Sequence, residues 1–123
     1  MITYDDFKKV EISAGKIISA EKIPDTDKLL KLVVDFAESI ETTREDGSKM
    51  SITKPRQIVS GISAYFPDPG VLVGKTCMFV TNLEPRIIKG YQSNGMLCAL
   101  STDSGSFSLL EPNASIPPGT QAK

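Results

Sequence analysis

The side chains best suited to binding chemistry lie in one polar stretch between two predicted strands. Arg86 and Lys89 are three positions apart there, with Asn82 before them and Ser93 after them. Arginine binds phosphate through a bidentate fork and lysine through a point charge. The amide and hydroxyl groups supply neutral hydrogen bonds that reach sugar hydroxyls. The stretch therefore indicates a phosphate-rich ligand, although an ordinary polar loop has the same composition.

Catalytic chemistry finds little support in the residue types. The chain has no histidine among its 123 residues, which removes the commonest general base and the usual Ser/His and Cys/His pairs. Ser60 and Ser104 lie beside glycines, and a lysine is the one activating group available to such a nucleophile. Asp25 and Asp27 lie in a predicted turn, where carboxylates cap the following segment. We therefore expect no enzyme activity.

The segment from Gly70 to Thr76 has the composition of a nucleotide-binding Walker A loop. Its two glycines are separated by three residues, whereas the motif requires four. The segment also leads into a predicted strand, so it lacks the helix N-terminus that would hold a phosphate. We exclude this motif.

The two cysteines, Cys77 and Cys98, both lie in apolar stretches. This placement predicts reduced core thiols that act as small hydrophobic side chains. Two cysteines without histidine or a CxxC pair do not supply a zinc ligand set. We expect no metal and no cofactor.

Charge is distributed unevenly along the chain although the net charge is only −1. Residues 1–48 carry seven basic and eleven acidic side chains, while residues 49–98 carry six basic and two acidic ones. A local cationic region can bind phosphate even when the total charge is close to zero. A solvated basic face without a partner would give the same distribution.

Length and composition are those of one folded domain that spans residues 1–123. Apolar residues make up 40% of the chain, enough for a modest core. The longest apolar runs are a few residues, far short of the roughly 20 that span a bilayer. The acidic N-terminus has no signal-peptide pattern, so we expect a cytoplasmic protein without membrane contact.

Short strands dominate the predicted secondary structure. Thr3 and Asp6 predict a helix start over residues 4–9. Gly15, in the middle of the first strand, indicates a bulge or tight bend. Asp46-Gly47 predicts a hairpin within a polar stretch at about 37–55. We expect strands at 10–20, 29–36, 57–62, 76–83 and 96–100, a helical turn at 71–74, a long polar connection at 84–94, and a turn into a last extended segment at 107–110.

Five core strands with one intervening helical turn fit an all-β OB-fold barrel. Periodicity alone also allows an SH3-like barrel or a β-sandwich. The fold class that we predict is a five-stranded OB-fold barrel with short helical turns and added terminal elements.

Motifs along most of the chain point to a known family. The most specific are Asn82-Leu83-Glu84-Pro85-Arg86 and the run 90–96, Gly-Tyr-Gln-Ser-Asn-Gly-Met. Further matching segments are 6–12, 15–17, 24–32, 56–62, 72–75 and 117–120. In these segments the sequence resembles the tRNA-binding domain family. That family includes the C-terminal extension or beta subunit of methionyl-tRNA synthetases, an insert in bacterial phenylalanyl-tRNA synthetase beta chains, endothelial monocyte-activating polypeptide and free-standing dimeric tRNA-binding proteins.

The resemblance implies binding to the tRNA elbow, the outside corner of the L shape, with little regard for sequence. It also implies a homodimer joined through a C-terminal extension at about 101–123, and a possible aminoacyl-tRNA synthetase as partner. By position, the family's tRNA-facing residues fall at Lys28, Lys31, Arg56, Asn82, Arg86, Lys89, Ser93 and Met96. Met96 could equally support the surface from the core.

Three departures from the family pattern keep a second function open. Ser13 stands where the family usually has arginine, Ile23 stands where it often has histidine, and the stretch 37–55 is longer than usual and acidic. The first two remove potential RNA contacts, and the third could shield RNA or dock a protein. The alternative is a dimeric chaperone of the same fold that binds unfolded or precursor polypeptides.

Overall fold

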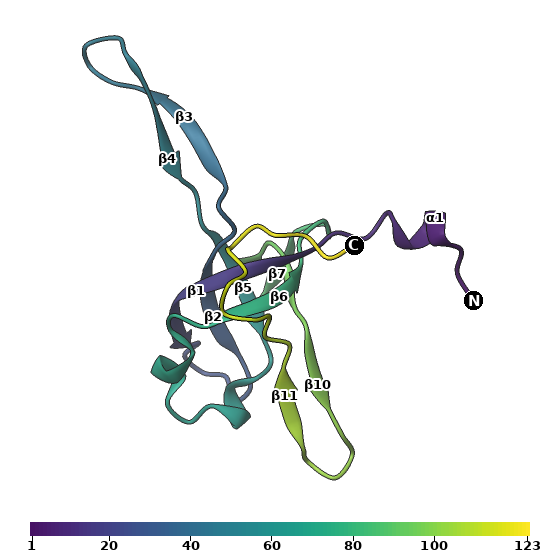
Figure 1. Cartoon of the computed structure of the whole chain (residues 1–123). Coiled ribbons are helices and arrows are strands. Elements are labelled where there is room, and N and C mark those ends of the chain that lie inside the picture. The colour runs from purple at the N-terminus through teal and green to yellow at the C-terminus, as the bar shows by residue number, and fades with distance from the viewer.

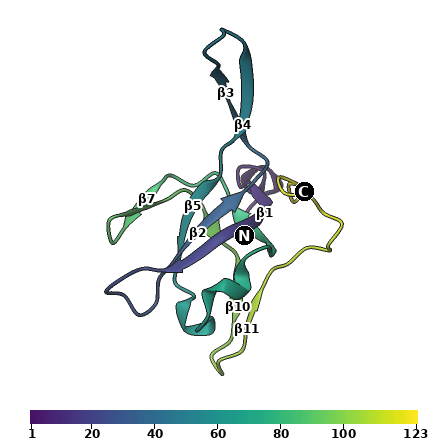
Figure 2. The ribbon, with the colours of Figure 1, turned by 90° about the vertical axis from the view of Figure 1, so that its left-hand side faces the viewer.

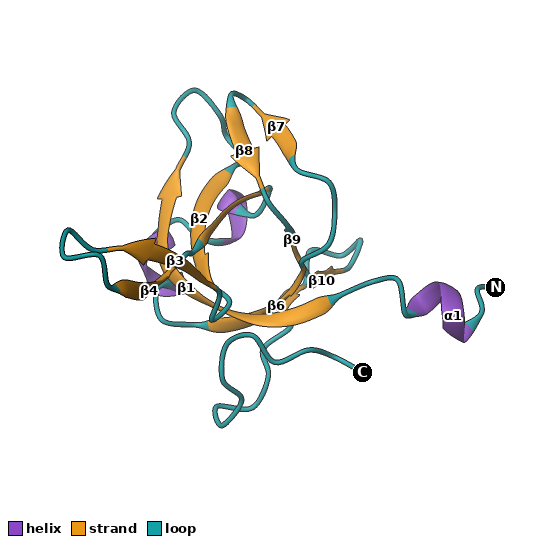
Figure 3. Ribbon diagram, turned by 90° about the horizontal axis from the view of Figure 1, so that it is seen from above, coloured by secondary structure: helices purple, strands orange, loops and turns teal.

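The computed structural model describes residues 1–123, and a curled antiparallel sheet forms its centre (Figures 1 and 3). The sheet has five strands in the order β5-β2-β1-β6-β9. These strands are β1 (Ile12–Lys22), β2 (Leu30–Asp35), β5 (Arg56–Ser60), β6 (Thr76–Val80) and β9 (Met96–Leu97). The nearly closed barrel with little helix confirms the predicted all-β OB-fold.

The barrel closes through hydrogen bonds between β5 and the segment just before β9. The backbone N–H of Val59 donates to the hydroxyl of Ser93 at 3.0 Å, and the N–H of Asn94 donates to the carbonyl of Gln57 at 2.9 Å. These bonds replace the ladder that would join the two edge strands. They satisfy edge groups that would otherwise be open to pairing with another chain.

Alternation along β2 explains the core. Leu30, Leu32 and Val34 are buried, and the residues between them are half-buried. Phe36 follows β2 and meets Phe79 of β6 edge to face, with ring centroids 5.3 Å apart. The buried core cluster contains Ile17, Leu30, Leu32, Val34, Phe36, Ile58, Ile62, Leu72, Cys77, Phe79 and Leu97.

Gly15 lies where β1 comes closest to this cluster, and the bulge predicted there lies elsewhere. A Cβ at position 15 would be 2.5 Å from Phe36 and 2.6 Å from Val34, so only glycine fits. The pairing register of β1 with β2 shifts between Ile17 and Ser19. The irregularity therefore falls at the exposed Ile18, and Gly15 serves close packing.

The polar stretch 37–55 forms a protruding hairpin, as Asp46-Gly47 predicted (Figures 1 and 2). Its strands are β3 (Ser39–Thr43) and β4 (Lys49–Thr53), and neither contains a buried residue. Asp35 accepts a hydrogen bond from the N–H of Ala37 at 2.8 Å, and Ala37 adopts a φ of 60°. This tight turn directs the chain out of β2 and into the hairpin.

The stretch 84–94, predicted as a polar connection, also forms a hairpin. Its strands are β7 (Arg86–Ile88) and β8 (Tyr91–Ser93). The turn residues Lys89 and Gly90 have φ angles of 52° and 84°, the left-handed pair that a two-residue hairpin turn needs. Glycine adopts this geometry without strain, and lysine adopts it at some cost.

Short elements complete the two ends of the chain. Helix α1 (Tyr4–Phe7) begins with the predicted capping box of Thr3 and Asp6. Two 3₁₀ turns, η1 (Ser63–Tyr65) and η2 (Pro69–Leu72), lie between β5 and β6, so the predicted helical turn begins two residues early. A last hairpin, β10 (Ala99–Ser101) and β11 (Phe107–Leu109), extends from the barrel (Figure 1).

The C-terminal tail returns to the start of β1. The N–H of Ala122 donates to the carbonyl of Ile12 at 2.8 Å, and Ser13 forms an isolated antiparallel bridge with Gln121. The two chain ends therefore leave the barrel close together. No helix in the structure is long and apolar enough to cross a membrane.

Candidate nucleic-acid interface

The β7–β8 hairpin presents two predicted RNA-binding cations to solvent. Arg86 and Lys89 are both exposed and form no ion pair. Arg86 pairs with Ser93 across the hairpin, so the two side chains share one face. That face is turned toward β5, because Ser93 contacts Val59 there. Ile87, on the opposite face, is 69% exposed.

Lys31 of β2 joins this surface through the ring of Tyr91. Its ammonium lies 5.6 Å from the ring centroid, in cation–π range, and 3.5 Å from the carboxylate of Glu21. Lys31 is thus held beside the hairpin. Lys28 is exposed in the loop that enters β2, and Figure 2 shows this loop and the β7–β8 hairpin projecting toward the same side of the barrel.

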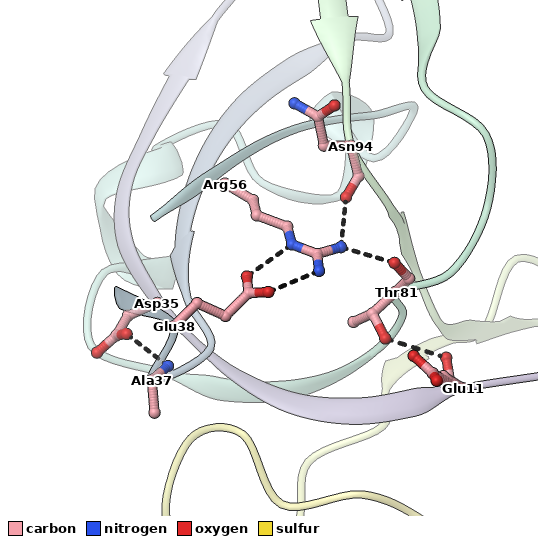
Figure 4. Close-up of polar contacts among 7 residues, drawn as sticks. All are labelled: Glu11, Asp35, Ala37, Glu38, Arg56, Thr81 and Asn94. Atoms are coloured by element: carbon pink, nitrogen blue, oxygen red, sulfur yellow. Dashed lines mark hydrogen bonds and ion pairs between the residues drawn. The ribbon is translucent and has the colours of Figure 1, made fainter. Parts of the chain in front are cut away.

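Arg56 has a different environment from the other predicted cations (Figure 4). Its Nε and Nη2 atoms donate to the two carboxylate oxygens of Glu38 at 2.7 and 2.8 Å. Its Nη1 atom donates to the carbonyls of Thr81 at 2.6 Å and Asn94 at 3.2 Å. The guanidinium also lies 5.4 Å from the ring centroid of Phe36. Every nitrogen of this guanidinium already has a partner within the chain.

The pKa of Glu38 lies below its ordinary value of 4.5, chiefly because its carboxylate accepts hydrogen bonds from Arg56. The same hydrogen bonds raise the pKa of Arg56. The pair is therefore fully charged near neutral pH.

Asn82 and Ser93 use their polar atoms inside the chain. The Asn82 side chain accepts from the N–H of Glu11 at 2.9 Å and donates to the carbonyl of Lys9. Ser93 is buried, and its hydroxyl accepts from Val59 and donates to the carbonyl of Gly95 at 3.1 Å. Met96, at the start of β9, is 49% exposed and pairs with Val80 of β6.

The structure thus divides the eight predicted residues into two groups. One group lies at the surface: Lys28, Arg86, Lys89 and Met96 are exposed, and Lys31 is half-buried beside the β7–β8 hairpin. The other group, Arg56, Asn82 and Ser93, is engaged in internal hydrogen bonds. Tyr91 and Glu38 are not among the eight predicted site residues, and the aromatic type of Tyr91, two positions after Lys89, was a usable signal for the first.

A cleft of about 530 Å³ lies between the base of the β3–β4 hairpin and the β7–β8 hairpin. Arg56 and Glu38 line it together with Lys54, Leu83 and Gln92. Its walls mix amide, charged and apolar groups. Its lining is mostly polar, unlike the largely apolar lining of a small-molecule pocket.

The structure contains no group of three or more His, Cys, Asp or Glu side chains placed to hold a metal ion. Cys77 is fully buried, and burial raises the pKa of its thiol to about 11. A thiol with so high a pKa is protonated at neutral pH and therefore unreactive.

Residues 12–121 match the family described as "Putative tRNA binding domain". The chain belongs to this family. The match covers all five barrel strands and the three hairpins β3–β4, β7–β8 and β10–β11. It confirms the resemblance that the motifs indicated.

Curated relatives carry a similar sequence within much longer proteins. The chain is 41% identical over 122 residues to the methionine–tRNA ligase of Methanocella arvoryzae, covering 99% of this chain and 15% of the ligase. It is 34% identical over 118 residues to the methionine–tRNA ligase of Enterococcus faecalis, covering 96% of this chain and 16% of that enzyme. The chain therefore spans about one sixth of the length of these relatives.

Two solved structures have the same fold over their whole length. A MetRS-related protein from Pyrococcus horikoshii superposes with a TM-score of 0.81 at 33% identity, covering 100% of this chain and 98% of that one. The CsaA chaperone protein from Picrophilus torridus superposes with a TM-score of 0.76 at 25% identity, with both chains fully covered. A synthetase-related protein and a chaperone thus share this fold.

Proposed function

We propose that this chain binds tRNA without catalysing a reaction, and that it does so through the β7–β8 hairpin and the adjoining surface of β2. The observation that carries this proposal is the exposure of Arg86 and Lys89, without ion-pair partners, beside the Lys31–Tyr91 contact. These groups form a cationic surface on a protein whose net charge is −1.

Charge and shape explain how such a surface would select tRNA. Lys28, Lys31, Arg86 and Lys89 contact phosphates, which position the RNA without reading its bases. The hairpin projects from the barrel with one cation at its tip and one at its root. This spacing suits contact with a bent RNA backbone, such as the outside corner of the tRNA L shape. Folded RNA is recognised mainly by shape and by backbone contacts, so sequence preference would be weak.

Four contacts of this kind give modest affinity, which suits a tethered module. When such a domain is linked or docked to a synthetase, it raises the effective concentration of tRNA at that enzyme. We propose this role in the cytoplasm, beside a methionyl-tRNA synthetase or as an independent tRNA-binding protein. The family membership and the methionine–tRNA ligase relatives support the proposal.

A peptide-binding chaperone is the second candidate. The fold shared with a CsaA chaperone favours it, as do exposed large apolar side chains such as Ile87 and Leu100. Apolar recognition would depend little on ionic strength, which separates the two candidates experimentally.

The first test is filter binding of bulk tRNA over a salt series, with duplex RNA and unstructured single strands as competitors. We expect affinity to fall steeply with salt, because each phosphate contact releases counterions. Intact tRNA should compete best. Absence of binding at low salt, or equal competition by all RNAs, would contradict the proposal, and salt-insensitive binding of unfolded polypeptides would favour the chaperone.

The matched variants are Arg86→Ala and Lys89→Asn, with Lys8→Ala, directly after α1, as the control. Asparagine is chosen at position 89 because it tolerates the left-handed backbone while removing the charge. We expect each variant to reduce the slope of log affinity against log salt by roughly one unit. The control should leave the slope unchanged, and an equal loss in the control would remove the hairpin from the interface.

A further inference from the structure

The two hairpins beside the cleft share one anchoring group at their roots. Thr81 and Asn94 stand at the two ends of the segment that contains the β7–β8 hairpin, and both carbonyls accept from Nη1 of Arg56 (Figure 4). Glu38 stands immediately before β3, and its carboxylate accepts from the other two nitrogens. One guanidinium therefore connects the root of each hairpin to β5.

Neighbouring contacts hold this arrangement in place. The carbonyl of Glu38 accepts from the N–H of Lys54 at 2.9 Å, which closes the base of the β3–β4 hairpin. Thr81 is fixed from the other side by its N–H and hydroxyl, which both donate to the carbonyl of Glu11. Phe36 supports the guanidinium through a cation–π contact. The bidentate pair with Glu38 fixes the orientation of the Arg56 guanidinium and also balances its charge.

We propose that Arg56 and Glu38 form a positioning pair, which fixes the β7–β8 hairpin in its RNA-binding orientation and keeps Arg56 from contacting phosphate itself. This inference rests on the tRNA-binding function proposed above, and it assigns Arg56 a role different from a direct contact. Arg86 and Lys89 touch the RNA, and Arg56 acts through them.

Competition between ligands supports this division of roles. A phosphate that approached Arg56 would have to displace the Glu38 carboxylate, which makes two charge-assisted hydrogen bonds at 2.7 and 2.8 Å. The carboxylate would then remain beside the phosphate and repel it. The depressed pKa of Glu38 shows that the carboxylate stays ionised where RNA binding is measured. The Arg56–Glu38 pair therefore presents no net charge to an approaching RNA backbone.

The decisive variant is Glu38→Gln, because the two roles predict opposite effects. If Arg56 positions the hairpin, loss of the carboxylate loosens the guanidinium and weakens tRNA binding, by about threefold to tenfold, with an unchanged salt slope. If Arg56 binds phosphate, the same substitution frees it, so binding tightens and the slope steepens by about one unit. Glu45→Gln is the matched control, since it removes one carboxylate from the tip of the same hairpin without touching Arg56.

Arg56→Lys provides the second comparison and keeps the positive charge. A positioning role requires the planar fork, so this variant should bind tRNA as weakly as Glu38→Gln, and the double variant should be no weaker than either alone. A direct phosphate contact would be largely retained by lysine. Near-normal binding by Arg56→Lys would therefore overturn the proposal, as would tighter binding by Glu38→Gln relative to Glu45→Gln.

Amide hydrogen exchange of the free protein tests the same pair without RNA. We expect faster exchange at residues 91–94 in Glu38→Gln and Arg56→Lys, while β1 and β2 remain protected. Unchanged exchange in the hairpin would contradict positioning even if tRNA binding fell. If the wild-type chain fails to bind tRNA but exchange rises as expected, the proposed function fails and the anchoring of the hairpin stands.

Discussion

At the scale of single residues, the chemical type of a side chain did not determine whether it faces a ligand or the protein. Ser93 has a hydroxyl suited to a ribose contact, yet it is 5% exposed and links β5 to the segment before β9. Asn82 similarly ties the N-terminal segment to the barrel. Their donors and acceptors were visible in the sequence. Their partners, 34 and 71 residues away, were not.

Ser93→Ala should destabilise the fold and leave the RNA surface intact. The substitution leaves the buried N–H of Val59 without its acceptor, which costs about 1–3 kcal/mol in the free energy of unfolding. Urea unfolding measures this loss, with Ser108→Ala on the exposed β11 strand as the control. A change below about 0.5 kcal/mol would mean that the Val59 amide finds another partner. Retained tRNA affinity in the folded variant would distinguish this role from direct contact.

At the scale of elements, prediction succeeded where a local signal was clear. The run of leucine and valine predicted β2, and Asp46-Gly47 predicted the turn of the β3–β4 hairpin. The β7–β8 hairpin was missed for two physical reasons. Its strands are three residues long. Lys89 also occupies the left-handed turn position at which asparagine or aspartate would have predicted a turn.

The candidate site was predictable to a similar extent. Solvent-facing cations followed from residue type and family resemblance, because charged side chains rarely become buried. The enclosure of Arg56 did not follow, since it depends on the turn at Ala37 that brings Glu38 back over β5. The close approach of Phe36 to Gly15 likewise required the three-dimensional fold.

The β3–β4 hairpin should be dispensable for folding. Replacing residues 41–51 by an Asn-Gly turn removes no buried side chain and preserves Glu38 and Lys54 at the root. We expect the free energy of unfolding to change by less than about 1 kcal/mol, measured by urea denaturation. tRNA affinity should stay within about threefold, because the removed segment carries three acidic and two basic residues. A tenfold loss of affinity would place RNA on this hairpin.

At the scale of the whole molecule, exposed apolar side chains are spread over the surface, and several of them lie on the terminal elements. Leu100 of β10 is 58% exposed, and Tyr4 and Phe7 of α1 are also exposed. Single exposed apolar residues are ordinary, but several on elements that project from a barrel indicate a surface covered by a partner. We propose that residues 101–123, with β10 and α1, form a homodimer interface.

Light scattering tests this dimer directly. We expect a mass near twice the 13.3 kDa of one chain at high concentration. Leu100→Asp should shift the mass to that of a monomer, because it places a charge in the apolar contact. Ile40→Asp, at a similarly exposed position on the β3–β4 hairpin, is the control. A monomeric mass for the unmodified chain would contradict the proposal.

The return of the C-terminal tail to β1 also determines how this fold would respond to force. Because Ile12 and Ala122 are hydrogen-bonded neighbours on antiparallel segments, tension between the two chain ends acts across their ladder and not along it. The bonds at Ile12 and then at Ala14 would break one after another, as in the opening of a zipper. The tail would peel away at low load while the five-stranded barrel, with Ser93 still closing it, remained folded. The tail would therefore yield first when the two ends are pulled apart.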